Sequence, residues 1–289
     1  MARKVKISAS ALNVRLHPHS PDIYMKWLRS IYSNRLVSQV HGDRYAMVSS
    51  IDGTGASNNI LTGAITTFVK LDGDGNWFNA AQMSEATEED ISEINIPRNL
   101  FPNAAAFYFY MDAEEHKIYF QTYSKGKYLT ANSALRFFNG LATQAPIASV
   151  FGQAKISIVQ DKSSLEYMFS IKKIKEINIR ISKPNTDIFD EDFEANIEKH
   201  LDGTNSREIT ISYRAESNSS IKPDDDINKI SKVALENGFV EVKGRDDQGA
   251  VRLNSEDYPK QLQDRYDPEE QSERAAFFRL IPARKKANN

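Results

Sequence analysis

The chain has 289 residues, a formal net charge of −2 and no cysteine, so disulfides, cysteine nucleophiles and metal sites built on thiolates are excluded. With 37 basic and 39 acidic side chains, nucleic acid or anionic lipid cannot be held by an overall positive charge, and such a partner requires a local basic patch. The first half begins with a predicted strand, 5–16, and a helix over 21–32. Ser20 suits the N-cap of this helix and Pro21 its first position. Further strands are predicted at 45–51 and 61–71.

The clearest local signal is a pair of aromatic-rich runs, 105–111 and 117–123, on either side of a polar turn. This pattern predicts a β-hairpin. A helix over 131–139 follows and is expected to end at Gly140. Because aromatic residues concentrate in this region, we place the core of the first half around the hairpin and this helix.

In the second half, predicted strands and helices alternate. Isoleucine at every second position predicts a half-buried strand over 177–181, and apolar residues four apart predict a helix over 189–201. The segment from Tyr258 onward reads as a charged tail. The other predicted elements are a strand at 155–159, a helix at 162–169, a strand at 208–213, a helix from 224 to 237, and a hairpin of 239–243 with 250–254.

The composition changes near Gln144-Ala145-Pro146, which separates two kinds of pattern. We therefore expect an α+β fold: an antiparallel-sheet N-terminal half with the aromatic hairpin, and a mixed α/β C-terminal half. The expected sub-domains are 1–145 (antiparallel α+β) and 146–289 (mixed α/β, with the charged tail). Whether the two halves share one continuous sheet stays open.

His17 and His19 form the most suggestive pair of histidines, since residues i and i+2 of an extended segment point the same way and can hold a metal together. Asp22 lies close by in the sequence. Against this, Pro18 interrupts the strand and Ser20-Pro21 starts a helix, so surface or capping histidines are the competing interpretation.

His41-Gly42-Asp43-Arg44 places a base, a carboxylate and a guanidinium in a loop before an apolar strand. An arginine fork suits phosphate, although Gly-Asp also favours a simple turn. If the two loops meet in one cleft, they provide six candidates for a nuclease site: His17, His19, Asp22, His41, Asp43 and Arg44. If they lie apart, this interpretation fails.

Cationic and aromatic residues alternate after the hairpin, at Lys125, Lys127, Tyr128 and Arg136. Aromatic rings beside cations form many nucleic-acid surfaces, and core packing is the alternative explanation for the rings. These four residues are our candidates for contact with nucleic acid.

Metal and cofactor motifs have little support. Asp72-Gly73-Asp74 begins like a calcium loop, but Trp77 and Met83 stand where that loop requires glycine and glutamate, so we expect a turn. There is no phosphate-binding glycine loop, nucleophile elbow or zinc-helix motif. We therefore expect no cofactor and no metal.

Several segments together resemble an uncharacterised bacterial family, the domain of unknown function numbered four thousand seven hundred and forty-seven. They include Leu12-Asn13-Val14-Arg15-Leu16-His17-Pro18-His19, His41-Gly42-Asp43-Arg44-Tyr45-Ala46-Met47, Lys183-Pro184-Asn185, and the run from Ala106 to Asp112. The segment from Glu236 to Arg245 belongs to the same set, and the resemblance spans about residues 6–280. It implies a gene neighbourhood of anti-phage defence and toxin genes, and it carries over no catalytic residue.

The leading expectation is a component of a bacterial anti-phage defence or toxin-type system that binds nucleic acid (DNA or RNA) or a partner protein of the same system, as a homo-oligomer. The alternatives are a nuclease with the His/Asp/Arg site and a purely structural scaffold subunit. The longest apolar stretch, 104–111, is far shorter than the ~20 residues that cross a membrane, and the N-terminus lacks a secretory apolar region. A cytoplasmic protein with no membrane attachment is expected.

Overall fold

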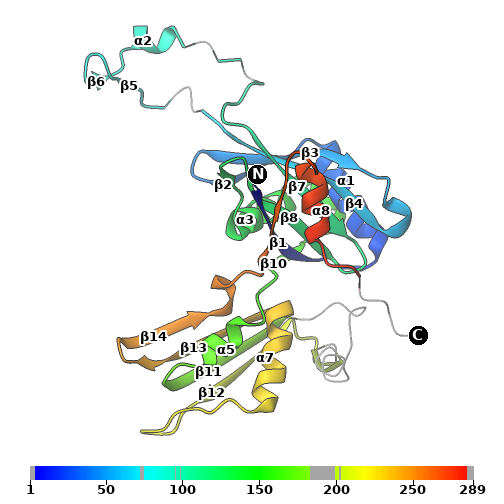
Figure 1. Ribbon diagram of the computed structural model, residues 1–289, viewed down its shortest axis with the longest axis vertical. Helices are drawn as coiled ribbons and strands as arrows, with labels where there is room; N and C mark the ends of the chain where they lie inside the picture. The colour runs from blue at the N-terminus through cyan, green and yellow to red at the C-terminus, as the bar shows by residue number, and fades with distance from the viewer. Residues whose placement is uncertain are drawn as a thin grey trace.

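The computed structural model describes residues 4–71, 75–94, 96–97, 99–182, 199–201 and 203–284. It is an α+β fold whose described residues form antiparallel sheets of nine, four and two strands (Figure 1). The predicted helix 189–201 falls almost wholly outside the described residues. No helix among the described residues is both long and apolar enough to cross a membrane.

The nine-stranded sheet has the order β10-β1-β8-β7-β4-β3-β2, with β15 also pairing with β1 and β9 with β8. Strand β1, which pairs with β8, β10 and β15, is buried on both faces, because Leu12 and Val14 face one core while Ile7 and Ala9 face another. The strands are β1 (Val5–Arg15), β2 (Val37–His41), β3 (Arg44–Asp52), β4 (Ile60–Val69), β7 (Ala105–Asp112), β8 (Lys117–Ser124), β9 (Lys127–Tyr128), β10 (Lys155–Ile158) and β15 (Leu262–Tyr266).

Three helices cover one face of this sheet: α1 (Pro21–Ser33), α3 (Ala131–Ala142) and α4 (Ala145–Phe151). The side chain of Ser20 caps α1, as predicted, by accepting a hydrogen bond from the Ile23 N–H. Helix α3 continues three residues past the expected end at 139. Gly140 is not its C-terminal cap but lies inside the helix, where a side chain would collide with Ser38 of β2.

The opposite face of the sheet carries α8 (Glu273–Leu280), which buries Phe277 against β1 and β7. The segment expected to be a charged tail thus contains β15 and α8. Strand β15 was missed because most of its side chains are exposed and it joins the sheet through its backbone, pairing Val5 with Tyr266.

The four-stranded sheet has the order β12-β11-β13-β14 and packs its isoleucine-rich face against α7. The predicted strands and hairpin of this region are present. The elements are α5 (Ser164–Phe169), β11 (Lys173–Ser182), β12 (Glu208–Arg214), α7 (Asp225–Asn237), β13 (Gly238–Asp246), β14 (Gly249–Asn254) and the short 3₁₀ helix η2 (Ser255–Asp257). Another short 3₁₀ helix, η1 (Ala56–Asn58), precedes β4 of the larger sheet.

The expected division at residue 145 falls between α3 and α4, which both pack on the larger sheet. Strands β10 and β15 of the second half also pair with β1. The smaller sheet is therefore inserted between two segments that belong to the larger one. Helices alternate with strands in the C-terminal half, as expected, and its described strands pair in antiparallel fashion.

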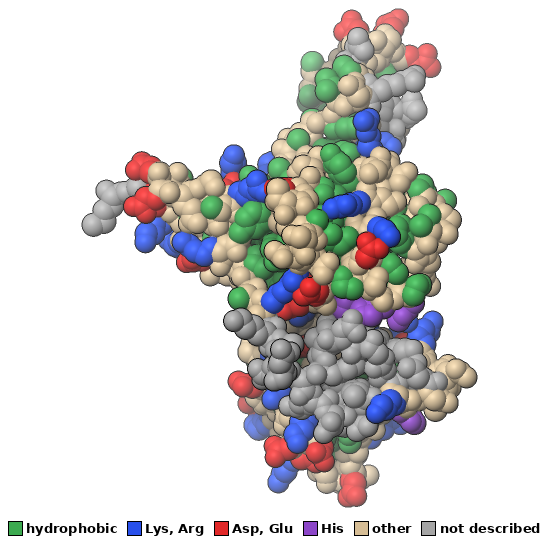
Figure 2. All heavy atoms as spheres, turned by 90° about the vertical axis from the view of Figure 1, so that its right-hand side faces the viewer, with side chains coloured by type: hydrophobic (Ala, Val, Ile, Leu, Met, Phe, Trp, Pro, Cys, Tyr) green, Lys and Arg blue, Asp and Glu red, His purple; other side chains and the backbone are tan. Residues whose placement is uncertain are grey.

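A segment between β4 and β7, residues 71–104, projects from the larger sheet (Figure 1) and forms the upper projection in Figure 2. We call this segment the arm. It contains β5 (Phe78–Asn79), β6 (Ser84–Glu85) and the one-turn helix α2 (Glu88–Ser92).

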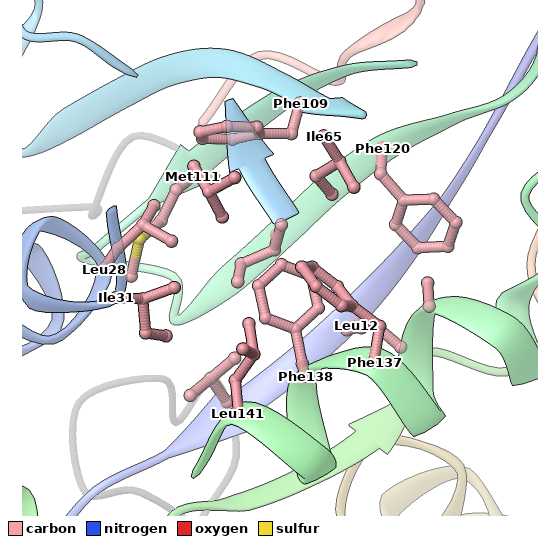
Figure 3. Close-up of a cluster of buried hydrophobic side chains, with 14 of the residues drawn as sticks. Leu12, Leu28, Ile31, Ile65, Phe109, Met111, Phe120, Phe137, Phe138 and Leu141 are labelled. Atoms are coloured by element: carbon pink, nitrogen blue, oxygen red, sulfur yellow. The ribbon is translucent and has the colours of Figure 1, made fainter. Parts of the chain in front are cut away.

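The main core lies between the larger sheet and its helices. Figure 3 shows Phe137, Phe138 and Leu141 of α3 pointing toward the aromatic and aliphatic side chains of the strands, with Leu28 and Ile31 of α1 beside them. This core contains Phe107, Phe109 and Phe120 of the predicted aromatic hairpin. The core fixes the positions of α3 and of the strand ends next to it.

Candidate nucleic-acid interface

The two histidine-bearing loops of the nuclease hypothesis lie at opposite ends of the larger sheet. Arg44 pairs with Val69 at the end of β4, where Thr67 pairs with Ala105 at the start of β7. His17 and His19 follow the end of β1 that lies beside the β7–β8 turn, because the Val14 N–H donates to the His116 carbonyl of that turn. The length of β7 separates the two ends by roughly 25 Å. The six candidates therefore do not form one cleft.

Around His19, the structure forms a packed cluster of rings. The His19 and His116 rings lie 4.4 Å apart, and Tyr24 lies 4.5 Å from His116. His19 Nδ1 is 3.1 Å from the Tyr24 hydroxyl, and both Tyr24 and His116 are fully buried. Burial lowers the pKa of the neighbouring Arg15. No sequence spacing linked His116 to this cluster.

The two carboxylates of the nuclease hypothesis, Asp22 and Asp43, are not part of the ring cluster around His19. The Asp22 carboxylate forms an exposed ion pair of 2.6 Å with Lys26, one turn along α1. The Asp43 carbonyl accepts a hydrogen bond from the Lys70 N–H. Among the described residues, no three His, Asp or Glu side chains gather in a way that could hold a metal ion.

His41 and Arg44 instead meet the predicted nucleic-acid residues. A pocket of about 290 Å³ lies where the β2–β3 turn, β4, β9 and the start of α3 come together. This volume is near the lower limit for sites that bind small organic ligands. We call it the Tyr128 pocket, and it is lined by Val40, His41, Arg44, Thr67, Tyr128, Leu129, Thr130 and Ser133.

Arg44 is held in place by two neutral oxygen atoms. Its Nη1 donates to the Tyr128 carbonyl at 3.4 Å, and its Nη2 donates to Thr67 Oγ1 at 3.1 Å. Thr67 is almost fully buried, so one anchor of the guanidinium is rigid. An arginine has five donors, and neither anchor carries a negative charge. The charge of Arg44 therefore stays available to an anion.

Tyr128, whose backbone carbonyl accepts from this guanidinium, presents an aromatic ring to solvent. The residue is 62% exposed, and its ring lies 5.0 Å from that of Tyr123 on β8. The turn that joins β8 to β9 has positive φ at both central residues, Lys125 (46°) and Gly126 (82°). Glycine adopts this conformation freely, but lysine does so at a cost of roughly 1–2 kcal/mol.

Helix α3 begins at the pocket. The Thr130 hydroxyl accepts from the Ser133 N–H and caps the helix, so the positive end of the helix dipole lies beside the pocket. The exposed Arg136 follows Ser133 by one helical turn. The pocket thus combines a fixed arginine, a helix N-terminus and a ring available for stacking.

Three exposed cations, Lys125, Lys127 and Arg136, flank the lining residues in sequence, and we call them the basic rim. Within the described part of the chain, no carboxylate lies within ion-pair distance of Arg44 or of the rim. Other arginines do pair with carboxylates: Arg180, Arg252, Arg274, Arg279 and Arg284. Unlike these five arginines, Arg44 and the rim cations carry charge that no carboxylate of the described residues neutralises.

Sequence reasoning placed His41 and Arg44 in one hypothesis and Tyr128 with the rim in another, and the structure brings them together. It missed Thr67, Thr130 and Ser133. Thr67 lies near the end of β4 among largely apolar neighbours, and no local pattern connects it with Arg44. Thr130 and Ser133 carry the sequence signature of a helix cap, which gives no sign of a pocket.

A comparison with protein-family models shows that the chain belongs to a family described as "Domain of unknown function (DUF4747)", which matches residues 5–282. No curated protein matches the chain. The family assignment covers both sheets, the arm and the Tyr128 pocket, and it supplies no activity.

Proposed function

We propose that this member of a family of unknown function binds single-stranded nucleic acid at the Tyr128 pocket. The observation that carries the proposal is that one pocket contains both Arg44, which is fixed by neutral partners, and Tyr128, whose ring is exposed. A cation without a carboxylate partner suits phosphate, and an exposed ring beside it suits a base. One nucleotide unit presents both a phosphate and a base, so the cation and the ring together suit it.

In the proposed complex, Arg44 donates two parallel hydrogen bonds to a phosphate, and the basic rim contacts the neighbouring phosphates. A base stacks on Tyr128, whose own contact with Tyr123 limits its motion. A base is available for such stacking only when it has left a duplex. Single strands should therefore bind more tightly than duplexes of the same sequence.

Binding should weaken steeply with salt. Each neutralised phosphate of a single strand contributes about −0.7 to the slope of log K against log salt concentration. Arg44 and the three rim cations together predict a slope of about −2 to −3. A slope near zero would contradict contact with phosphates.

The experiment is a titration of a fluorescent twelve-nucleotide single strand, RNA and DNA separately, at low and moderate ionic strength. Lys125→Glu, Lys127→Glu and Arg136→Glu combined should weaken binding at least tenfold. The matched control is Lys222→Glu, Lys229→Glu and Lys232→Glu, which changes the charge equally at exposed positions on or next to α7. Failure to retain either strand at low ionic strength would overturn the proposal.

Tyr128 allows a second comparison. Tyr128→Phe keeps the ring and should bind normally, whereas Tyr128→Ala should lose roughly 1–3 kcal/mol of binding, the usual contribution of one stacked base. Equal binding by both variants would exclude stacking on Tyr128. The thermal midpoint should be unchanged in both, since the ring is mostly exposed.

We further propose that this binding serves a bacterial anti-phage defence or toxin-type system in the cytoplasm. The support is the family resemblance and the implied gene neighbourhood. The test is phage plating on cells that express the chain with and without its neighbouring genes. Protection that is lost in Arg44→Ala would link the pocket to defence, and protection that is unaffected by this variant would separate the two.

A further inference from the structure

The arm is firmly attached at its root. The Val69 N–H donates to the Pro102 carbonyl at 3.0 Å, and Phe68 stacks on Phe101 with 4.7 Å between ring centroids. Beyond this root, the arm extends away from the larger sheet (Figure 1). The root of the arm is therefore held by the sheet that carries it.

The arm has no core of its own. None of its described residues is buried, and several large apolar side chains are exposed: Phe78 (68%), Met83 (82%), Leu100 (59%), Leu71 (40%), Ile96 (39%) and Ile94 (36%). Its internal order rests on a few hydrogen bonds, such as that between Asn79 and Asp90 at 3.2 Å. A two-stranded ribbon and a one-turn helix are not stable alone in water. The arm should therefore pack against another surface.

Charge indicates what kind of surface this is. Residues 71–104 contain seven acidic side chains and one basic side chain. Figure 2 shows acidic side chains at the end of the projection and hydrophobic ones along it. The complementary surface must be basic and partly apolar.

The Tyr128 pocket and its basic rim have this character. Arg44 and the exposed Tyr128 line the pocket, the rim cations flank its lining residues in sequence, and none of the four cations has a carboxylate partner in the described chain. The pocket also lies at the root of the arm, because Arg44 binds Thr67 two residues before the end of β4. The arm leaves β4 at that end and extends away from the larger sheet (Figure 1).

We propose that two copies of this chain form a dimer by exchanging arms, with the acidic, apolar arm of each copy seated on the basic rim and Tyr128 of the other. Since the pocket adjoins the root of the arm, a single two-fold axis can place each arm on the pocket of the other copy. Both arm-to-pocket contacts then form within one dimer, and no further copy is needed. The exchange covers the apolar side chains of the arm and neutralises the rim.

The dimer is measured without nucleic acid, so the proposal does not depend on the proposed function. One consequence does rest on it: single-stranded nucleic acid and the arm use the same cations and should compete. A dimer that binds no nucleic acid would overturn the proposed function alone. A monomer that binds nucleic acid would overturn the arm exchange alone.

The experiment is sedimentation velocity of the full chain over a range of protein and salt concentrations. Two charge-reversed variants are compared with the parent. The arm variant carries Glu88→Lys, Glu89→Lys and Glu93→Lys, and the rim variant carries Lys125→Glu, Lys127→Glu and Arg136→Glu. Each alone should raise the dimer dissociation constant at least tenfold, because its arm and rim repel.

Mixing the two variants gives the decisive result. In a mixed dimer, the reversed arm meets the reversed rim and the unchanged arm meets the unchanged rim, so both contacts are restored. The mixture should dimerise at the parent's concentration. The control variant, Glu166→Lys with Glu269→Lys and Glu270→Lys, changes exposed acids elsewhere and should dimerise normally.

Three results would overturn the proposal: a parent chain that stays monomeric at all concentrations, a dimer indifferent to both reversals, or a mixture that remains monomeric. Unfolding of a variant is excluded by its thermal midpoint, which should match the parent's because no arm residue in the described chain is buried. If lysine unwinds α2, the corresponding glutamine variant, Glu88→Gln with Glu89→Gln and Glu93→Gln, should still weaken the dimer by a smaller factor.

Discussion

At the scale of single residues, substitutions of Arg44 test whether its segment belongs to a binding pocket or is only a turn. Arg44→Lys keeps the charge but loses the fork that reaches both Thr67 and Tyr128. We expect Arg44→Lys and Arg44→Ala each to lose roughly 1.5–3 kcal/mol of binding to the single strand, the usual value for a charge-assisted hydrogen bond.

The control for Arg44 is stability, measured by urea unfolding of the same samples. Because Arg44 also joins the Thr67 side chain of β4 to the Tyr128 carbonyl of β9, a loss of about 1 kcal/mol in the free energy of unfolding is expected in both variants. Full binding by both variants would show that the His41-Gly42-Asp43-Arg44 segment is only a turn.

Lys125 provides a test in which stability and binding should change in opposite directions. Its φ of 46° is unfavourable for lysine and well tolerated by asparagine, especially before a glycine in a two-residue hairpin turn. Lys125→Asn should therefore raise the free energy of unfolding by roughly 0.5–1 kcal/mol while it weakens binding of the single strand. Urea unfolding and the binding titration measure the two effects. A more stable variant that binds as tightly as the parent would remove Lys125 from the interface.

At the scale of elements, Arg284 ties the segment after α8 to the larger sheet. Arg284 Nε donates to the buried Asp112 at 2.5 Å, and its Nη1 contacts Glu114 at 2.7 Å. Nη2 also donates to the Asn58 carbonyl at 2.6 Å. This arginine therefore joins the β7–β8 turn, the loop before β4 and the end of α8.

Arg284→Ala should lower the free energy of unfolding by roughly 1.5–3 kcal/mol, because a buried carboxylate loses its charged partner. Asp112→Asn with Arg284→Ala should lose less than the sum of the two single changes, since the pair is removed together. Arg279→Ala is the comparison, because its partner Asp264 is exposed and the change should cost under about 1 kcal/mol. Equal losses for Arg279→Ala and Arg284→Ala would contradict this description of the attachment.

Elements with strong local signals could be predicted from the sequence. The N-cap Ser20, the aromatic hairpin and the isoleucine strand of β11 gave α1, β7, β8 and β11 within a few residues. Strand β15 and helix α8 could not be predicted, because β15 joins the sheet through backbone pairing with β1, over 250 residues away, and α8 buries only Ala276 and Phe277. Local periodicity carries no information about such distant partners.

At the scale of the whole molecule, the same limit applies to the candidate site. Arg44 and Tyr128 were each singled out by their own surroundings, but 84 positions separate them and only the order of strands in the sheet brings them together. Conversely, the sequence allowed His17 and His41 to meet, and the sheet places them at opposite ends. The candidate residues could thus be identified from the local sequence, but which of them lie close together could be found only from the fold.

The central claim is that a single strand stacks on Tyr128, and photochemical cross-linking tests it most directly. The full chain is irradiated with a single-stranded RNA containing 4-thiouridine, digested with trypsin and analysed by mass spectrometry. Cleavage after Lys127 and Arg136 isolates peptide 128–136, which contains Tyr128 and the start of α3. We predict that this peptide carries the main adduct and that Tyr128→Ala removes it. A main adduct on peptides of the four-stranded sheet, or none at all, would contradict the account.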